Sequence, residues 1–470
     1  MNESILSKDI SKFHFNATKN LVILCIASYV VVTGFGVIIP FFPIFANDFL
    51  DIFEIGPFVI GIAFQIGILT SAFMFTRFLL APSFGDLSDV SGRKPIILVG
   101  MSIYGFLMIG FGLAFDFWTL LIIRLLQGVA SAAVWPVGEA LIVDTAPKEK
   151  IGKYLGYYMM SMQAGMATGP FIGFGSFYLL NSLLKLPVTI SYRLSFISVG
   201  ILGVISVIII AFFVTDPITL KLDRSDSNLK TLYVSSLKTM LVTINQSPKF
   251  WYETLKKKLP YRNRSIYAIY VIAIINGIGL AMVFPIISLF LEDYYLMDPG
   301  SIALVIGIVG MLGLVGGPLG GYLSDKFTRK SVVWITEFFG SIALFILGFK
   351  MVVGFLIIFL VCQRFIFAIV QPSFRALQSD LIPPSVRGKE FGLVQASANF
   401  GSVLGPLIGG FFYDLFYYEN YRFFTLTYFG SGIAFIFASV AAFIAGVFVL
   451  LFINVERDKF LEQDITAQPI

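Results

Sequence analysis

The chain has 470 residues, of which 57% are hydrophobic and only 13% are charged, and its mean hydropathy is +0.88. A soluble globular protein is about a quarter charged and less than half apolar, so this composition predicts a polytopic membrane protein. The net charge of +5 is not concentrated in a basic patch interleaved with aromatic residues, and we expect no nucleic-acid partner. Two cysteines and one histidine exclude a disulfide framework and most metal sites.

Apolar runs long enough to cross a bilayer, about 20 residues, occur in two groups. The first group lies at 20–46, 57–81, 96–115, 118–144, 154–180 and 192–214. The second group lies at 265–291, 301–322, 331–351, 353–380, 389–413 and 422–453. We therefore predict an N-terminal bundle at 20–214, a linker at 215–264 and a C-terminal bundle at 265–453, flanked by an N-terminal segment at 1–19 and a tail at 454–470.

The distribution of basic residues over the loops predicts the orientation. One side of the membrane would carry only Lys185, Arg193, Lys350 and Arg422, whereas the other would carry most of the remaining lysines and arginines. Loops rich in Lys and Arg stay in the cytoplasm, so we predict a cell-membrane protein with both termini cytoplasmic. The linker at 215–264 contains ten basic residues and leucines at helical spacing. A basic helix on the inner membrane surface and a solvated tether both fit it.

One ungapped register relates the two halves of the chain. Gly392 follows Gly156 by 236 residues, and the same offset joins Asp144 to Asp380. It also joins GDLSDVSGRK at 85–94 to GYLSDKFTRK at 321–330. The chain is therefore predicted to be a duplicated six-helix unit. Because six is even, both copies enter the membrane from the same side. The predicted fold is an all-α integral membrane protein with twelve transmembrane helices in two parallel, pseudo-symmetric bundles.

The fifth and eleventh expected spans share a pattern of glycines and a proline. The residues predicted to pack and bend these helices are Gly156, Gly165, Gly169, Pro170, Gly173, Gly392, Gly401, Gly405, Pro406 and Gly409. Small residues at four-residue spacing let helices approach closely in lipid, and an internal proline bends a helix. An ordinary tight helix pair explains the glycines but not the repeated proline. We therefore predict helices that pack tightly and pivot.

These motifs together resemble a known family. The six-plus-six helices, GDLSDVSGRK, RLLQG in the fourth span and the Gly-Pro pattern resemble the major facilitator superfamily. With GFGVIIPFFP in the first span, they resemble most its twelve-helix drug:proton antiporter branch. The resemblance covers residues 20–453. It implies a secondary transporter rather than an enzyme, working by alternating access in the lipid membrane as a monomer. No cofactor is expected, and a proton would be the coupling ion.

The resemblance also implies a latch of charged residues at the cytoplasmic helix ends, which breaks during the conformational change. Its residues would be Gly85, Asp89, Gly92, Arg93, Lys94, Asp144, Asp325, Arg329, Lys330, Asp380 and Arg387. Asp89 is expected to oppose the basic pair that follows it. Asp144 has Lys150 and Lys153 nearby, and Asp380 precedes Arg387. Val90 and Thr328 depart from the family pattern, which often has a basic residue and usually a glycine there. Plain positive-inside topology is the alternative explanation of these charges.

The fourth expected span places Arg124, Ser131, Trp135 and Glu139 on one helical face. A charge inside the bilayer costs at least about 2.5–3.5 kcal/mol, so these residues should face a cavity or a partner. The resemblance assigns Arg124 to proton coupling. Glu139 is taken as the only acid well inside a span, and an acid in a poorly hydrated cavity can bind and release a proton near neutral pH. Two interpretations stay open: Glu139 carries the coupled proton, or it neutralises a nearby arginine.

The tenth expected span mirrors the fourth. Arg364, Gln371, Arg375 and Gln378 share one face and are predicted, with Ser131 and Trp135, to line the substrate cavity. Arg375 is the repeat partner of Glu139. The two are expected to interact across the cavity in one state, unless each is held within its own half. Four arginines against one glutamate in the spans, and no acid within 21–45, predict an anionic, zwitterionic or neutral amphiphilic substrate rather than a lipophilic cation.

Three functions remain open at this point. The favoured one is a proton-driven antiporter that exports small amphipathic or anionic organic compounds, as in multidrug resistance. The second is a proton-coupled or facilitative importer of an organic anion or other small solute, which the arginines suit equally well. The third is a membrane receptor or enzyme, which would need a clustered catalytic constellation or a folded domain outside the membrane.

Overall fold

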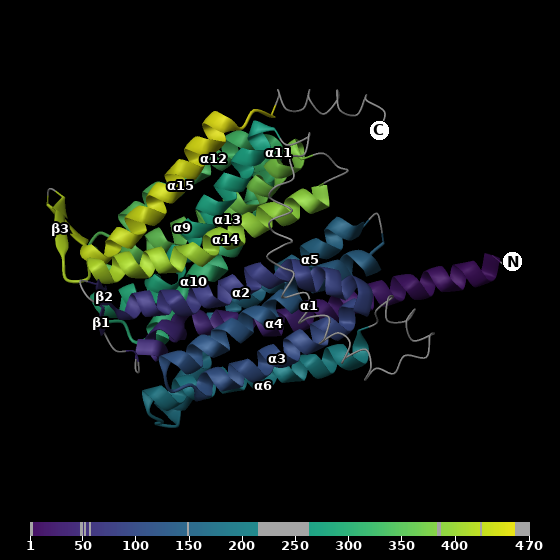
Figure 1. Cartoon of the computed structure of the whole chain (residues 1–470), viewed down its shortest axis with the longest axis horizontal. Coiled ribbons are helices and arrows are strands. Elements are labelled where there is room, and N and C mark those ends of the chain that lie inside the picture. Colours follow the sequence, from purple (N-terminus) through teal and green to yellow (C-terminus); the bar gives the residue numbers. More distant parts are fainter. Residues whose placement is uncertain are drawn as a thin grey trace. The chain divides into compact units, whose positions relative to one another are not determined.

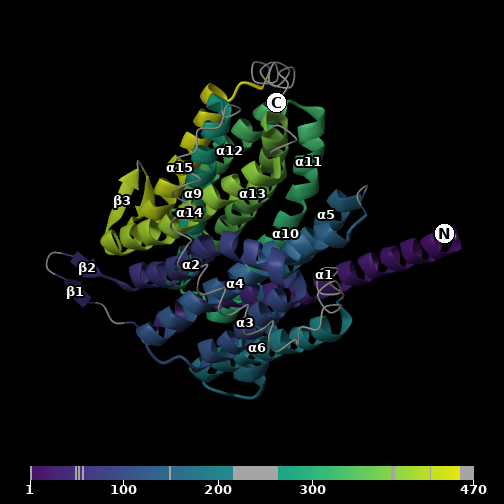
Figure 2. The same cartoon turned by 45° about the vertical axis from the view of Figure 1, so that its right-hand side comes forward.

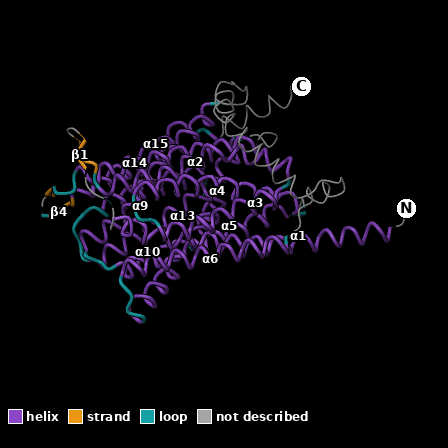
Figure 3. Tube along the Cα trace, turned by 60° about the horizontal axis from the view of Figure 1, so that its bottom comes forward, coloured by secondary structure: helices purple, strands orange, loops and turns teal. Residues whose placement is uncertain are grey.

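The computed structural model describes residues 3–47, 50, 53–55, 58–147, 150–214, 263–382, 387–423 and 425–455. Figure 3 shows that helix dominates this part of the chain. The helices form two units, Met1–Ile38 with Thr76–Lys256, and Ile39–Phe75 with Lys257–Ile470. The predicted linker and tail lie outside the described residues, apart from 263–264 and 454–455. The domain boundaries drawn from the sequence stay predictions.

Figures 1 and 2 label the helices in chain order. The helices before residue 215 are α1 (Glu3–Asn47), α2 (Ile62–Ser91), α3 (Arg93–Leu113), α4 (Phe117–Thr145), α5 (Ile151–Tyr178) and α6 (Val188–Phe213). Those after it are α9 (Arg264–Tyr295), α10 (Pro299–Leu314), α11 (Gly316–Lys326), α12 (Arg329–Ile346), α13 (Val353–Leu381), α14 (Arg387–Leu415) and α15 (Ile433–Phe452). Ten helical segments of the described chain are long and apolar enough to cross a membrane, with α10 and α11 counted as one. Adding α5 and α12 gives the twelve predicted spans.

Several element boundaries in the first half of the chain differ from those expected. α1 runs without a break from Glu3, so helix already covers most of the segment predicted at 1–19. The second span begins at Ile62 rather than at 57, because β1 (Phe53–Ile55) and β2 (Phe58–Ile60) form a hairpin before it. The predicted inner loop is helical up to Ser91, so Gly92 alone separates α2 from α3. Its φ of 89° and ψ of 154° fall in a region that is essentially restricted to glycine.

Thr328 takes the place of this glycine in the second half. Its φ is −63° and its ψ is 127°, an extended conformation that any residue adopts. The departure from the family pattern at Thr328 therefore carries no backbone strain.

The twelfth span also begins later than predicted. Residues from 422 onward were expected to be helical, but β3 (Asn420–Phe423) and β4 (Leu426–Phe429) form an antiparallel hairpin. A 3-10 turn, η3 (Gly430–Gly432), follows, and α15 starts at Ile433. Aromatic and threonine residues in YRFFTLTYF favour strands, whereas hydropathy alone does not distinguish a strand from a helix. A π-helical turn, η2 (Leu179–Leu183), extends α5.

The repeated glycines lie at close helix contacts in both units. A Cβ added to Gly401 or Gly405 of α14 would lie 2.1 Å or 2.4 Å from a carbonyl oxygen of α9. A Cβ added to Gly165 of α5 would lie 2.6 Å from the carbonyl oxygen of Tyr29, and one on Gly169 would lie 2.5 Å from the Cα of Gly36 in α1. These contacts leave no room for a side chain, as close packing in lipid requires.

Other members of the pattern occupy different positions. Gly409 also packs on α9, against Met282, whereas Gly156 and Gly392 have nothing within 4 Å of an added Cβ. Pro170 and Pro406 lie inside α5 and α14, which continue past them. Close packing therefore accounts for part of the pattern only.

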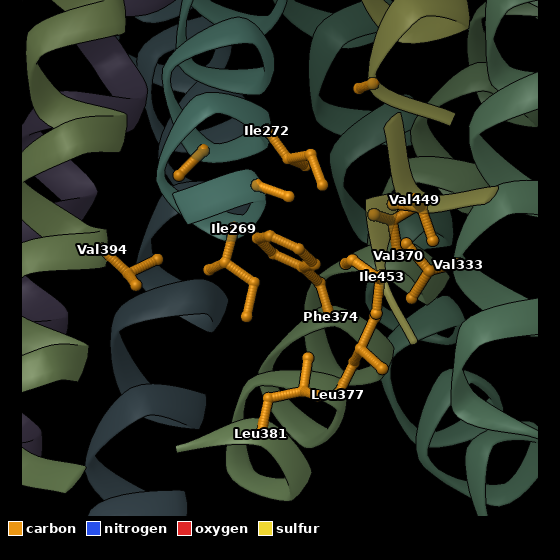
Figure 4. Packing of buried hydrophobic residues seen from close by; sticks show 13 residues of the cluster. Ile269, Ile272, Val333, Val370, Phe374, Leu377, Leu381, Val394, Val449 and Ile453 are labelled. Atoms are coloured by element: carbon orange, nitrogen blue, oxygen red, sulfur yellow. The ribbon is translucent and has the colours of Figure 1, made fainter. Parts of the chain in front are cut away.

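Apolar side chains from several helices fill the interior of the second unit. Ile269 and Ile272 of α9 meet Phe374 and Leu377 of α13 and Val449 of α15 (Figure 4). This cluster holds α9 and α13 in fixed rotation about their axes, which decides which of their polar side chains reach the surface.

Candidate functional site

The first part of the site is a latch that joins helix ends within the first unit. Arg93 Nε donates to Asp144 Oδ2 at 2.9 Å, and Arg93 Nη1 donates to Ser88 Oγ at 2.5 Å. Lys94 Nζ donates at 2.8 Å to the carbonyl oxygen of Ala211, in the last turn of α6. A cation at a helix C-terminus is favourable because it meets the negative end of the helix dipole. These contacts join α2, α3, α4 and α6.

The second unit contains the same arrangement. Arg329 Nη1 pairs with Asp380 Oδ1 and donates to the carbonyl oxygen of Ala376 at 3.1 Å. Lys330 Nζ donates at 2.7 Å to the carbonyl oxygen of Ile453, directly after α15. Arg329 and Asp380 are the repeat partners of Arg93 and Asp144, so the duplication has preserved the ion pair as well as the sequence.

The partners in this latch differ from those considered in the sequence. Asp144 pairs with Arg93 of α3, and neither Lys150 nor Lys153 forms an ion pair with it among the described residues. Gly85 contributes its carbonyl oxygen, which accepts from Arg93 Nη1 at 3.5 Å. The side chains of Asp89 and Arg387 lie outside the described part of the structure, and Asp325 is exposed.

Three predicted residues of α4 are buried within the first unit. Arg124 is 4% exposed, and its guanidinium lies 5.0 Å from the ring centre of Phe111. Arg124 Nη1 also donates to Gln127 Oε1 at 3.5 Å. Ser131 and Trp135, two and three turns further along α4, are also buried. This face therefore packs against neighbouring helices of its own unit.

Aromatic residues that were not predicted for the site lie beside this face. The ring of Phe35 stacks on Tyr104 at 5.1 Å and lies 6.4 Å from Trp135. Among the described atoms, Tyr104 Oη and Ser131 Oγ are buried without a hydrogen-bond partner. Buried hydroxyls normally have one, so these two oxygens are available to a further hydrogen-bond partner.

Glu139 is half-buried and interacts electrostatically with Arg77 of α2 and Tyr158 of α5. All three residues belong to the first unit. Arg124 lies fifteen residues before Glu139 in the same helix, about 22 Å away, so the two cannot pair. Arg77, unlike Arg124, interacts with Glu139 within the same half. This is what the interpretation of Glu139 as the neutraliser of a nearby arginine requires.

A polar strip of four residues crosses α13 and α14 in the second unit. It consists of Gln371, Arg375, Gln395 and Asn399. Arg375 Nη2 donates to Gln395 Oε1 at 3.1 Å, and Gln395 Nε2 donates to Asn399 Oδ1 at 3.4 Å. Gln371, Arg375 and Gln395 are exposed. Exposed polar side chains within apolar helices face water rather than lipid.

The strip contains only part of the predicted cavity lining. Gln378 is buried, and Arg364 is half-buried with its guanidinium 5.6 Å from the ring centre of Phe367. Gln395 and Asn399 were not among the residues predicted for the cavity. Both stand in GLVQASANFG, and polar residues in an apolar run were the available signal.

The expectation that Glu139 is the only acid well inside a span is wrong. Glu337 lies in the middle of α12 and is 6% exposed. Glu390, in the first turn of α14, is fully buried and accepts a hydrogen bond from Tyr270 Oη. Asp293 of α9 accepts from Tyr413 Oη at 2.8 Å. The interior is therefore less basic than predicted, and the signal for Glu337, an acid inside the expected span 331–351, was present in the sequence.

A helical membrane protein whose halves repeat one ion pair and one set of glycine contacts has the architecture of a duplicated transporter. The sequence profile of the Major Facilitator Superfamily matches residues 24–260 and 269–466, and the chain belongs to this family. The predicted family and the all-α membrane fold are thereby confirmed. The protein is a multi-pass membrane transporter, not an enzyme.

Curated relatives cover nearly the whole chain. The multidrug resistance protein MdtG of Proteus mirabilis is 29% identical over 436 residues, which cover 89% of this chain and 93% of the relative. The quinolone resistance protein NorA of Staphylococcus aureus is 23% identical, with coverage of 95% and 100%. Multidrug resistance protein 2 of Bacillus subtilis is 24% identical, with coverage of 86% and 91%.

Solved structures share the fold at lower sequence identity. A D-xylose–proton symporter superimposes with a TM-score of 0.69 at 14% identity, covering 94% of this chain and 99% of its own. A bacterial homologue of the human lysosomal transporter Spinster gives a TM-score of 0.68 at 15% identity, with coverage of 94% and 96%. At this identity the likeness shows the fold alone.

Proposed function

We propose that the protein exports small amphipathic or anionic organic compounds across the cell membrane in exchange for protons, with both termini in the cytoplasm. The observation that carries the proposal is the polar strip of α13 and α14. It combines one cation, Arg375, with three neutral amide side chains on a surface that lipid cannot cover. The names of the relatives, which refer to multidrug and quinolone resistance, support export.

The strip favours a substrate with a carboxylate or another planar anionic group. A guanidinium binds such a group with two parallel hydrogen bonds, and the amides of Gln371, Gln395 and Asn399 supply further donors and acceptors. Arg375 is not in one of the ion pairs of the described residues, so its charge remains available to a ligand. Two apolar helices flank these groups and suit the rest of an amphipathic molecule.

Everted membrane vesicles with an imposed pH gradient test the direction and the coupling. Acid inside should drive accumulation of a quinolone or an anionic dye, and a protonophore should abolish it. Proton-driven uptake into right-side-out vesicles instead would establish an importer. Preference for ethidium-like cations over anions would refute the proposed substrate class.

Arg375→Gln tests the role of the strip. We expect its apparent affinity for an anionic substrate to fall at least tenfold, because a charge-assisted pair contributes about 1.5–3 kcal/mol. Arg422→Gln is the matched control, since Arg422 is exposed in β3, outside the strip. Equal transport of the anion by both variants would remove the strip from the substrate site.

A further inference from the structure

Glu337 is a buried acid for which neither the family pattern nor the latch accounts. It lies eight residues after Arg329, where α12 begins, about 12 Å along the helix axis. This distance is close to half of the roughly 30 Å thickness of a bilayer's hydrocarbon core. Its side chain faces α9 and α15 rather than solvent, and only 6% of the residue is exposed.

The partner of Glu337 is a neutral amide. Asn276 Nδ2 of α9 donates to Glu337 Oε1 at 2.7 Å. From α15, Gly446 closes the other side, where an added Cβ would lie 3.2 Å from Glu337 Cβ and 3.4 Å from the carbonyl oxygen of Trp334. Among the residues that the structure describes, no lysine or arginine of α9, α13 or α15 forms an ion pair with this carboxyl group.

Burial of a carboxylate without a cation disfavours the ionised form strongly, and one amide donor compensates only in part. The packed arrangement of α9, α12 and α15 therefore favours the protonated acid. The ionised form is favoured once these helices separate and water reaches the group. Proton binding at Glu337 is thus linked to the packing of α9.

The repeat shows that helix packing does not require an acid at this position. The residue 236 positions earlier is Met101 of α3, which is buried at 2% exposure. The first copy of the duplicated unit therefore fills the equivalent site with an apolar side chain. An acid that packing does not need, and that the membrane makes costly, indicates a function.

A short series of contacts connects this acid to the polar strip. Asn276 is followed by Gly277, where an added Cβ would lie 2.2 Å from the carbonyl oxygen of Ala398 in α14. Ala398 directly precedes Asn399 of the strip. A shift of α9 at Asn276 therefore acts directly on the part of α14 that carries Asn399. Close packing transmits such shifts because the contact leaves no free space.

We propose that Glu337 and Asn276 form a proton-binding site of the second half, distinct from the α4 face of the first half. A proton taken from water forms the O–H bond of the Glu337 carboxyl group when α9 packs as here, and returns to water when α9 moves away. The proposal rests on the proposed proton-coupled function. It assigns one titrating group to that coupling.

The Glu337→Gln variant, reconstituted as full-length protein in liposomes, tests the proposal. A glutamine keeps the volume and the acceptor for Asn276 but cannot titrate. Two quantities are compared: substrate accumulation driven by a pH gradient, and substrate exchange at equal pH on both sides. We expect the ratio of the first to the second to be at least tenfold lower in the variant than in the wild type. Glu419→Gln, at an exposed glutamate between α14 and β3, should keep the wild-type ratio. A wild-type ratio in Glu337→Gln would overturn the proposal.

An infrared titration separates this inference from the proposed function. Wild-type protein should show a protonated-carboxyl band that disappears as the pH rises and that Glu337→Gln lacks, whether or not transport is proton-driven. In Asn276→Leu the ionised form loses the one donor that the described residues supply to it, so the band should persist to higher pH. A band that stays unchanged in Glu337→Gln would refute the site. If that variant does not fold, an unchanged pH midpoint of the band in Asn276→Leu would refute it. Absence of proton-driven transport by the wild type would refute the proposed function alone.

Discussion

Substitution of Gly401 by alanine should weaken the packing of α14 on α9. The added Cβ would lie 2.1 Å from the carbonyl oxygen of Ile274, whereas real Cβ atoms essentially never lie within 3.0 Å of such an atom. The two helices must therefore separate by about 1 Å locally, and overpacking of this kind costs about 1–3 kcal/mol. Part of that cost is lost dispersion, because a gap of about 0.5–1 Å forfeits a quarter to a half of each contact energy.

Gly392→Ala is the matched control for this prediction. Gly392 lies in the same helix with nothing within 4 Å of an added Cβ, so the variant should gain only the helix propensity of alanine, about 1 kcal/mol. Gly401→Ala makes the same gain, and the difference between the two variants isolates the helix contact. Thermal unfolding of the purified protein in detergent measures it. We expect a lower Tm for Gly401→Ala than for Gly392→Ala, and equal Tm values would show that the contact does not limit packing.

Three further predictions concern the ends of the helices. Gly92→Ala should destabilise the protein by about 1–3 kcal/mol because φ at this position suits only glycine, whereas Thr328→Ala should change Tm little. Asp144→Asn should cost about 1–3 kcal/mol, since it leaves the guanidinium of Arg93, whose side chain is 11% exposed, without its anion; an unchanged Tm would mean that the ion pair contributes nothing. Asp116 caps α4 by accepting from the backbone N–H of Thr119 at 2.6 Å, which lowers the pKa of its carboxyl group. The stabilisation is therefore present above the unfolded pKa of about 3.9 and is lost as the pH falls through the lower folded value, so the Tm values of wild type and Asp116→Ala should differ at pH 7 and converge in acid.

The duplicated sequence predicted much of the molecule. Its offset predicted both acids of the latch, Asp144 and Asp380, and the packing glycines of α5 and α14. Hydropathy predicted the spans because the bilayer fixes how long an apolar helix must be. The same criterion missed the β3–β4 hairpin, since aromatic strands and apolar helices have similar hydropathy.

The contacts of the candidate site could not be predicted in this way. The sequence offered Lys150 and Lys153 as partners of Asp144, but the structure selects Arg93, 51 residues away on another helix. Helical periodicity placed Arg364 and Gln378 with Arg375 on one face. Arg364 packs against α10, and Gln378 is buried in the interior of the unit. The residue that lies beside Arg375 is Gln395 of α14.

By itself, the sequence determined a twofold repeat of membrane-spanning helices and which positions in them are small, charged or bent, because lipid and backbone chemistry act on each segment locally. Only the tertiary structure decided which of those positions meet. The rotation of each helix about its axis is set by neighbours that are remote in the chain, and that rotation decides whether Arg375 reaches the surface or Glu337 meets Asn276.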